Sequence, residues 1–293
     1  MPSRSIIGID IGGTKMALAR YGEGTWKKEE DRSLPTLAHR GIEAVLEEIL
    51  SAADDLRRED TQAVGIGVPG LVLQPEGTVL TTPNIPCPEN FPLKQFLCNR
   101  LHLPVFVEND ANCFTLAEAL QGAGKGRRVV VGITLGTGVG GGIVVDGRLF
   151  HGSHGFAGEI GHMLLRPGDP PFVAEDRRGD VEQFLSGSAL RKRCPKAKNP
   201  QEYLQGETCA PLSQEVVRET AWLCANLVHL LDPSTIIFGG SAGLALKSHL
   251  RAIAEELGKW VLPGTPLPLL ATAILDDAGT RGAALLSLTP SHP

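Results

Sequence analysis

The stretch GIDIGGTK, residues 8–15, decides the fold, because it recurs in altered form as GITLGTGV, residues 132–139. Each copy is an apolar strand that runs into a Gly/Thr turn and then into a second apolar strand. The copies lie 124 residues apart, which is too long a period for a solenoid. The spacing therefore predicts two related α/β domains. Chance similarity of two glycine-rich hairpins is the alternative that the repeat alone leaves open.

Length and composition are those of a globular protein with an ample core. The chain has 293 residues, of which 42% are hydrophobic and 21% are charged, so disorder, collagen and coiled coil are excluded as the main state. The net charge of −5 gives no general attraction to nucleic acid. The best basic group, Lys125 with Arg127 and Arg128, lacks interleaved aromatic residues and is interpreted as a solvated loop. We expect no nucleic-acid partner.

Nothing in the sequence predicts a membrane or secreted protein. The longest uncharged stretch, residues 129–145, contains six glycines and is shorter than a typical span. The opening residues lack the apolar region of a signal peptide, which favours a cytoplasmic location. The six cysteines form no C-x-x-C pair, so free thiols in a reducing compartment are expected.

Apolar periodicity predicts alternating strands and helices. Strands are expected at residues 5–10, 15–21, 63–68, 105–107 and 235–238, and helices over 41–56, 109–120, 213–231, 242–257 and 282–288. Residues 122–126 carry three glycines and are the candidate linker. The weak periodicity of residues 161–212 predicts no regular element.

The first hairpin has the groups of a phosphate site. Glycines allow close approach of backbone N–H groups to an anion, Thr and Lys add donors, and a carboxylate can hold a hydrated metal ion. These groups are Asp10, Gly12, Gly13, Thr14 and Lys15. The pattern is neither a Walker A loop nor a Rossmann fingerprint, because the glycines lead into a strand. The second hairpin, with Gly136, Thr137 and Gly138, could bind the same polyphosphate ligand as the first. Either hairpin alone is explained as well by a structural turn.

Two further segments combine carboxylates with polar groups. In ENDAN, residues 108–112, Asn109 or Asp110 could be a helix N-cap, or Asp110 could accept the proton of an attacking hydroxyl at a strand end. In AGEIGH, residues 157–162, Glu159 and His162 match the vicinal hydroxyls of a sugar. A lone histidine is more often structural, and Glu182 on its own would be a surface carboxylate.

Together these segments resemble the ROK family of sugar kinases (repressor, open reading frame, kinase) within the actin-like ATPase superfamily. The resemblance also covers DPSTIIFGG, residues 232–240, and DAGTRGAA, residues 277–284. It implies an α/β fold of two actin-like (ribonuclease H-like) ATPase domains flanking a central cleft. The expected domains are residues 1–121 with 281–293, and residues 122–280.

The resemblance implies ATP- and Mg²⁺-dependent phosphorylation of a hexose at its C6 hydroxyl. Asp110 resembles the catalytic base, and Asp10 the residue that holds Mg²⁺ with ATP. The implied sugar ligands are Asn84, Asn109, Asp110, Glu159, His162 and Glu182. The implied ATP-binding residues are Asp10, Gly12, Gly13, Thr14, Lys15, Gly136, Thr137, Gly138, Gly239 and Gly240. A homodimer is a family expectation.

The chain departs from the family at one place. Many members have three cysteines before the equivalent of Glu182, and with the histidine of E-x-G-H these bind a structural zinc. Here the three positions are Val173, Glu175 and Asp180, which is too poor a set for zinc. No structural zinc is expected.

The motifs specify the reaction better than the sugar. Glucose is favoured, and N-acetylglucosamine or N-acetylmannosamine is the alternative within the same family. A catalytically silent sugar sensor or regulator is the non-enzyme alternative. A DNA-binding repressor is disfavoured, because only nine residues precede Asp10.

Overall fold

A computed structural model of the chain describes residues 4–288. The chain divides into two compact units. The first comprises residues 1–117, 148–157 and 275–293, and the second residues 118–147 and 158–274. The division after residue 117 falls inside helix α3 (Asp110–Gln121). The expected linker, residues 122–126, lies within the second unit, where the Ala123 N–H donates to Glu118 Oε2 at 2.8 Å.

The first unit is built on a five-stranded sheet of order β3-β2-β1-β4-β7. Its strands are β1 (Ser5–Ile11), β2 (Lys15–Gly22), β3 (Lys28–Pro35), β4 (Thr61–Val68) and β7 (Val105–Asn109). Strands β1, β4 and β7 are parallel, whereas β2 and β3 are antiparallel to their neighbours. The carboxyl ends of β1, β4 and β7 therefore meet at one edge, where ligands of α/β sheets bind.

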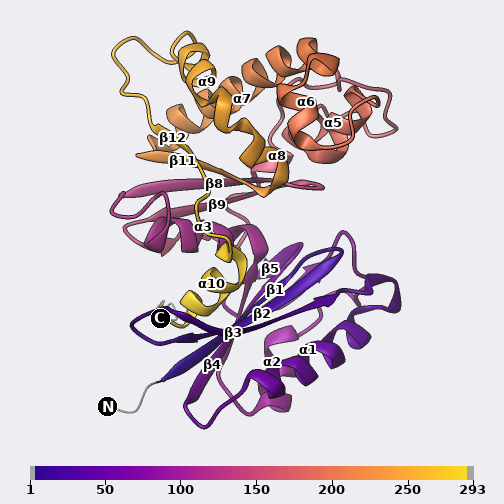
Figure 1. The fold of residues 1–293 in the computed structure, drawn as a ribbon, viewed down its shortest axis with the longest axis vertical. Coiled ribbons are helices and arrows are strands. Elements are labelled where there is room, and N and C mark those ends of the chain that lie inside the picture. Colours follow the sequence, from indigo (N-terminus) through magenta and orange to yellow (C-terminus); the bar gives the residue numbers. More distant parts are fainter. Residues whose placement is uncertain (1–3, 289–293) are drawn as a thin grey trace. The chain divides into compact units, whose positions relative to one another are not determined.

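The two faces of this sheet carry different side chains. Ile7, Ile9 and Ile11 are buried in the core with helices α1 (Ile42–Leu56) and α2 (Leu93–Leu101). The opposite face presents Gly8 and Gly65 to helix α10 (Ala278–Leu285). A Cβ at Gly8 or Gly65 would lie 1.8 Å from a carbonyl oxygen of α10. Glycine thus lets a helix lie directly on β1 and β4, opposite α1 and α2 (Figure 1).

A buried polar cluster fixes helix α10 to β2. The Tyr21 hydroxyl lies 2.7 Å from Thr280 Oγ1 and donates to Asp277 Oδ2 at 3.0 Å. Arg281 makes two 2.9 Å bonds to the same carboxylate. The helix begins at residue 278, four residues before the start expected from the sequence, and Asp277 precedes it without a side-chain capping bond.

The second unit repeats the central strands of the first. Strands β8 (Val129–Leu135), β9 (Val139–Val145), β11 (Thr235–Gly239) and β12 (Leu269–Thr272) have the order β9-β8-β11-β12. This matches β2-β1-β4-β7, with β8–β9 antiparallel and β8–β11 and β11–β12 parallel. Strands β8 and β9 begin 124 residues after β1 and β2. The repeat predicted from the sequence is confirmed.

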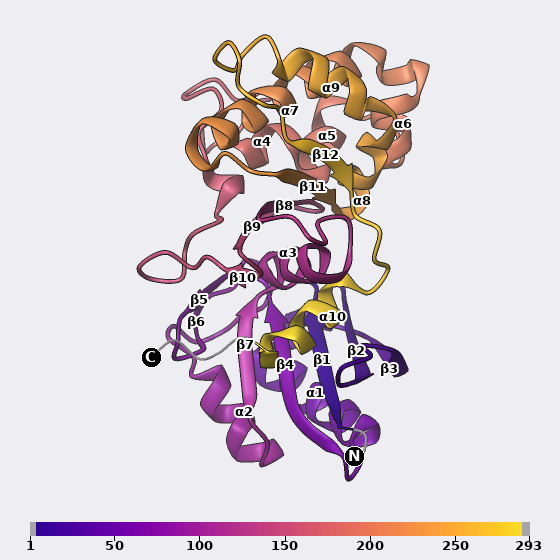
Figure 2. The ribbon, with the colours of Figure 1, turned by 90° about the vertical axis from the view of Figure 1, so that its left-hand side faces the viewer.

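Helices cover the second sheet, with α7 (Ala210–Leu231) the longest among the described residues (Figure 2). The expected helix over 242–257 is interrupted: α8 (Gly240–Ala245), a 3₁₀ turn (Leu246–His249) and α9 (Leu250–Leu257) take its place. The segment without predicted structure contains α4 (Val181–Leu185), α5 (Gly187–Arg193) and α6 (Pro200–Gln205). The remaining short strands are β5 (Leu71–Leu73), β6 (Thr78–Thr81) and β10 (Arg148–Leu149). The other 3₁₀ turns are Ala38–Arg40, Ile160–His162, Glu207–Cys209 and Leu286–Leu288.

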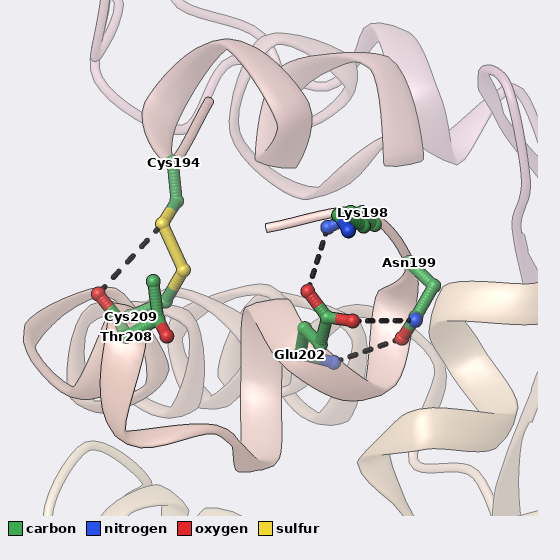
Figure 3. The surroundings of a disulfide bond; sticks show 6 residues. All are labelled: Cys194, Lys198, Asn199, Glu202, Thr208 and Cys209. Carbon is green, nitrogen blue, oxygen red and sulfur yellow. Dashed lines mark hydrogen bonds between the residues drawn. A yellow bond between two sulfur atoms is a disulfide. The ribbon is translucent and has the colours of Figure 1, made fainter. Parts of the chain in front are cut away.

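The expectation that all six cysteines are free is wrong for one pair. Cys194 and Cys209 form a disulfide on either side of α6 (Figure 3). Helix α6 has Asn199 as its N-cap, whose Oδ1 accepts the Glu202 N–H at 3.0 Å. This short helix brings the two Cα atoms to 6.2 Å, within disulfide range, although no cysteine motif marks the pair. Cys87, Cys98, Cys113 and Cys224 are free thiols.

Between residues 4 and 288, none of the helices has the length and apolar character needed to cross a membrane.

Candidate active site

The first glycine hairpin is a tight turn that presents its polar groups to solvent. The Gly12 N–H donates to the Lys15 carbonyl at 3.0 Å, and the Thr36 hydroxyl donates to the Gly12 carbonyl at 2.7 Å. Gly13, Thr14 and Lys15 are exposed. A Cβ at Gly13 would lie 3.3 Å from Asn84 Nδ2. The first unit thus brings Asn84 beside the hairpin, where a side chain at position 13 would require the Asn84 amide to shift by a few tenths of an ångström.

Asp10 ends the apolar part of β1 on the face covered by α10. A Cβ at Gly279 would lie 2.2 Å from Asp10 Oδ2, so the carboxylate packs directly on the first turn of the helix. Burial raises the pKa of Asp10 to about 6. Within residues 4–288, no hydrogen bond reaches this side chain. A desolvated carboxylate without a positively charged partner suits a hydrated divalent cation.

Asn109 and Asp110 stand where β7 runs into α3. Asn109 Oδ1 accepts the Ala111 N–H at 2.9 Å and the Asn112 N–H at 3.2 Å, and Nδ2 donates to the Gly70 carbonyl at 3.0 Å. Asn109 therefore caps the helix, and the bond to Gly70 uses one of its two amide hydrogens. Asp110 is partly exposed, with Oδ1 2.8 Å from the Ala111 nitrogen.

The charges of Asp10 and Asp110 both act on the thiol of Cys113, which lies beside Gly67. A Cβ at Gly67, at the end of β4, would lie 3.4 Å from the Asp110 Cα and 3.1 Å from Cys113 Sγ. Burial, together with the charges of Glu108, Asp10 and Asp110, holds the pKa of the Cys113 thiol well above its usual value. The carboxylates of Asp10, on β1, and of Asp110, directly after β7, thus lie at one acidic edge of the sheet, on either side of Gly67.

The second hairpin is held by the corner between α4 and α5. Glu182 Oε2 accepts the Val139 N–H at 2.8 Å, and the Gly136 carbonyl accepts the Gly187 N–H at 2.7 Å. A Cβ at Gly138 would lie 2.5 Å from Glu182 Oε2. The sequence-predicted residue Glu182 therefore contacts the predicted ATP hairpin.

The Gly239–Gly240 turn lies against the same hairpin. Gly240 has φ +72°, and a Cβ there would lie 2.5 Å from the Leu135 carbonyl oxygen. A side chain would therefore be strained and would collide with the start of the turn. This packing places the two expected ATP-binding segments of the second unit together.

Glu159 and His162 flank a single 3₁₀ turn. Burial raises the pKa of Glu159, and the nearby His162 opposes that shift. The His162 side chain is exposed, and its Nδ1 lies 3.6 Å from Asp180 Oδ2. Asp180 is buried and caps α4 by accepting the Gln183 N–H at 3.2 Å. The two side chains present an acceptor and a donor near each other, as sugar hydroxyls require.

The residues at the family's zinc-cysteine positions do not fit a zinc ion. Val173 and Glu175 are exposed on a loop, and only Asp180 approaches His162. Among residues 4–288, no cluster of three or more His, Cys, Asp or Glu side chains could hold a metal. At this corner Asp180 lies beside His162 and caps α4.

Two residues of the site were missed by sequence reasoning. Glu108, directly before Asn109, is buried and accepts four hydrogen bonds, one of them from His151 at 2.6 Å. A charged residue at the end of a buried strand was the available signal for Glu108. His151 is 43 residues away in the sequence, and nothing local points to it.

A duplicated α/β sheet with a glycine hairpin at the end of each first strand is the actin-like ATPase architecture, and the predicted fold class is confirmed. The ROK family model matches residues 6–289. The chain belongs to the ROK family.

Individual relatives cover nearly the whole chain. A glucokinase of Thermotoga maritima is 33% identical over 97% of this chain and 97% of its own length. An N-acetyl-D-glucosamine kinase of Erwinia tasmaniensis is 33% identical over 96% of this chain and 98% of its own. Among solved structures, a ROK family glucokinase from Streptomyces griseus, in complex with glucose and AMPPNP, has a TM-score of 0.77 with 33% identity, covering 96% of this chain and 98% of that one.

Proposed function

We propose that this protein is an ATP-dependent hexose kinase that phosphorylates the C6 hydroxyl of its sugar, with glucose as the favoured substrate. The observation that carries the proposal is the acidic edge of the first unit. There Asp110, at the start of α3, lies beside Gly67, and the exposed donors of the Gly12–Lys15 hairpin follow the strand that carries Asp10. Family membership and relatives named as glucokinases and N-acetylglucosamine kinases support it.

Phosphoryl transfer depends on the positioning of the reactants and on the neutralisation of charge more than on covalent catalysis. Asp110 accepts the proton of the sugar hydroxyl while the oxygen of that hydroxyl bonds to the γ-phosphorus of ATP and the bond to ADP breaks. Backbone N–H groups of the two hairpins, with Thr14, Lys15 and Thr137, bind phosphate oxygens. Asn84, Asn109, Glu159, His162 and Glu182 bind the sugar, and Gly239 and Gly240 contact the adenosine.

Asp10 is the residue we propose for the magnesium ion of MgATP. Its buried carboxylate, with a pKa raised to about 6, would be stabilised in the charged form by a cation held through water. When bound, Mg²⁺ neutralises the phosphate charge that develops during transfer. The proposal assigns no zinc to the protein.

The decisive experiment is a coupled ADP-release assay over a panel of hexoses and N-acetylhexosamines, with ATP and Mg²⁺. We expect sugar-dependent ADP release that is greatest with glucose. Relatives named as glucokinases are 33% and 34% identical to this chain, and those named as N-acetyl-D-glucosamine kinases are 33% identical, so N-acetylglucosamine and N-acetylmannosamine are the second candidates. Greater turnover of an N-acetylhexosamine would change the substrate and keep the reaction. Binding of sugar without ADP release from any member would identify a silent sensor.

Two properties of the whole protein complete the proposal. A cytoplasmic location is consistent with ATP as phosphoryl donor, and a homodimer with the resemblance to the family. Fractionation of cells and light scattering of the purified protein test these two points.

A further inference from the structure

Glu108, the last buried residue before the Asn109-Asp110 pair, is surrounded by donors. Its side chain is 3% exposed. Oε1 accepts the Asn109 N–H at 2.8 Å and Asn112 Nδ2 at 3.0 Å. Oε2 accepts a hydrogen bond from Gln74 Nε2 at 3.3 Å. It also lies 2.6 Å from His151 Nε2, and this nitrogen is the donor because an ionised carboxylate can only accept. All four partners belong to the first unit.

These bonds hold the peptide that carries Asp110 from two sides. The bond from the Asn109 N–H fixes the Glu108–Asn109 peptide, one residue before Asp110, and the bond from the Asn112 side chain anchors the first turn of α3 just after it. Asn109 Oδ1 closes the same turn through its bonds to the Ala111 and Asn112 N–H groups. The Asp110 backbone therefore lies between two points anchored on one carboxylate.

His151 and Gln74 in turn fix the carboxylate. His151 reaches Glu108 from the segment 148–157, and Gln74 follows strand β5; Gln74 Nε2 also donates to the Val107 carbonyl at 2.8 Å. Burial lowers the pKa of the His151 imidazole, but the hydrogen bond and the charge of Glu108 outweigh burial, so that the pKa is raised. A buried carboxylate is costly unless it is paired and fully hydrogen-bonded, and this one meets both conditions.

We propose that Glu108 is a positioning residue for the kinase reaction, and that His151 is the donor that holds its carboxylate in the orientation that aims Asp110. This inference rests on the proposed function of Asp110 as the base. Glu108 does not touch the substrate; it acts through the Asn109-Asp110 peptide. Because a misplacement of about 1 Å can reduce turnover by about 100-fold, loosening this turn should lower kcat more than it raises the KM for sugar.

The test compares Glu108→Gln with a matched control on the same helix. An amide at position 108 must turn its NH₂ toward one oxygen site, and donors occupy both sites, so at least one bond is lost. Glu118→Gln makes the same change at another buried glutamate of α3, whose Oε1 accepts the Ile274 N–H at 2.9 Å and whose Oε2 accepts the Ala123 N–H at 2.8 Å. Both variants should lose thermal stability.

Turnover separates the two substitutions. At a temperature well below either melting transition, we expect Glu108→Gln to lower kcat about 10- to 100-fold, with the KM for sugar within about threefold of wild type. Glu118→Gln should keep kcat within about threefold. A kcat for Glu108→Gln within about threefold of wild type, or equal losses in both variants, would overturn the positioning role while leaving the kinase assignment intact. A wild-type protein that phosphorylates no sugar would overturn both.

A second pair of variants decides the matter if Glu108→Gln does not fold. His151→Gln keeps a side-chain N–H donor of similar reach, whereas His151→Phe keeps the ring volume and removes the donor. We expect His151→Gln to retain kcat within about threefold and His151→Phe to lose about tenfold or more, with the KM for sugar little changed in both. Equal turnover in these two variants would show that the donor is not needed, and the proposal would be wrong.

Discussion

The two glycine hairpins have the same backbone origin and different chemistry. Strands β1 and β8 are both seven residues long and begin 124 residues apart, and each runs through a short turn into an antiparallel partner. At the position of Asp10 the second copy has Thr134, and at the position of Lys15 it has Val139. Of these two pairs of positions, only those in the first hairpin carry charged side chains, Asp10 and Lys15.

The supports of the hairpins differ as well. Two hydrogen bonds from other segments hold the second turn. The Glu182 carboxylate accepts the Val139 N–H, and the Gly187 N–H donates to the Gly136 carbonyl. The first turn is held from outside by Thr36, whose hydroxyl donates to the Gly12 carbonyl, and each turn also closes on itself, through the Gly12 N–H on the Lys15 carbonyl and the Gly136 N–H on the Gly138 carbonyl. We therefore propose a division of labour: the proton and metal roles belong to side chains of the first unit alone, and the second hairpin serves only to bind phosphate, a role that it shares with the first hairpin. Substitutions of Asp110 or Asp10 should therefore reduce kcat, whereas those in the second hairpin should raise the KM for ATP.

The largest effect is expected for Asp110→Asn. The amide keeps the size of the side chain and loses its basicity, so turnover should fall by about 10²- to 10⁴-fold, while sugar affinity stays within a few fold. Coupled ADP release and isothermal titration with sugar measure the two quantities. Asp146→Asn is the control, because Asp146 is exposed with φ +50°, a conformation that asparagine tolerates. Equal losses of binding and turnover would make Asp110 a ligand instead of the base.

Reduction of the disulfide should destabilise the second unit alone. Cys194 and Cys209 close a loop with a sequence separation of 15, for which the loss of crosslinking is worth roughly 3 kcal/mol. The free cysteines at 87, 98 and 113 belong to the first unit and should not respond to a reductant. Calorimetry with and without dithiothreitol, with Cys87→Ser as control, measures the effect. A melting transition that is unchanged by dithiothreitol would show that the crosslink contributes nothing to stability.

A smaller effect is expected from the ionisation of Asp10. Its pKa is raised from 3.8 to about 6 by burial, so the charged form is disfavoured in the folded state. The resulting loss of stability is absent below about pH 4, grows as the pH rises, and is complete above about pH 6. In the absence of Mg²⁺ and nucleotide, Asp10→Asn should therefore stabilise the protein at pH 8, by up to about 3 kcal/mol.

Melting curves of wild type and Asp10→Asn at pH 4.5 and pH 8 measure the difference. The gain should be much smaller at pH 4.5, where most Asp10 side chains are already neutral. Thr134→Asn, at the equivalent position of the second hairpin, is the control without an ionisable group. A gain of equal size at both pH values would mean that the shape of the amide, and not the charge, is responsible.

The sequence predicted elements with a clear apolar pattern well and short elements poorly. Strands β1 and β2 and helices α1 and α3 were predicted to within one residue of their ends. The internal echo predicted a strand on either side of the second glycine turn, which are β8 and β9, without giving their ends. Helices α4 to α6 are five to seven residues long, too short to establish a helical period. The start of each of these helices is set instead by a capping residue, such as Asp180, whose carboxylate accepts the Gln183 N–H.

The site shows the same limit. The spacing of a motif could place Asp110 at the end of a strand, since strand and helix signals flank it. The His151 bond to Glu108 and the Asn84 contact with Gly13 join segments 43 and 71 residues apart, and no local pattern encodes such pairings. The disulfide was missed for a related reason, because the proximity of its two cysteines is created by helix α6 between them.

The smallest effect, and the sharpest test of the division of labour, is expected inside the second hairpin. Gly138→Ala would bring a Cβ to 2.5 Å from Glu182 Oε2, so that the carboxylate must turn away and lose its bond to the Val139 N–H. Gly136→Ala adds the same methyl group where no described atom lies within 4 Å. We expect Gly138→Ala to raise the KM for ATP about tenfold, equivalent to about 1.4 kcal/mol, and to raise the KM for sugar as well because Glu182 is a proposed sugar ligand, with kcat nearly unchanged. Gly136→Ala should have the smaller effect. If both variants instead lowered kcat as a first-unit substitution does, phosphate binding and proton transfer would not be separable between the two copies of the hairpin.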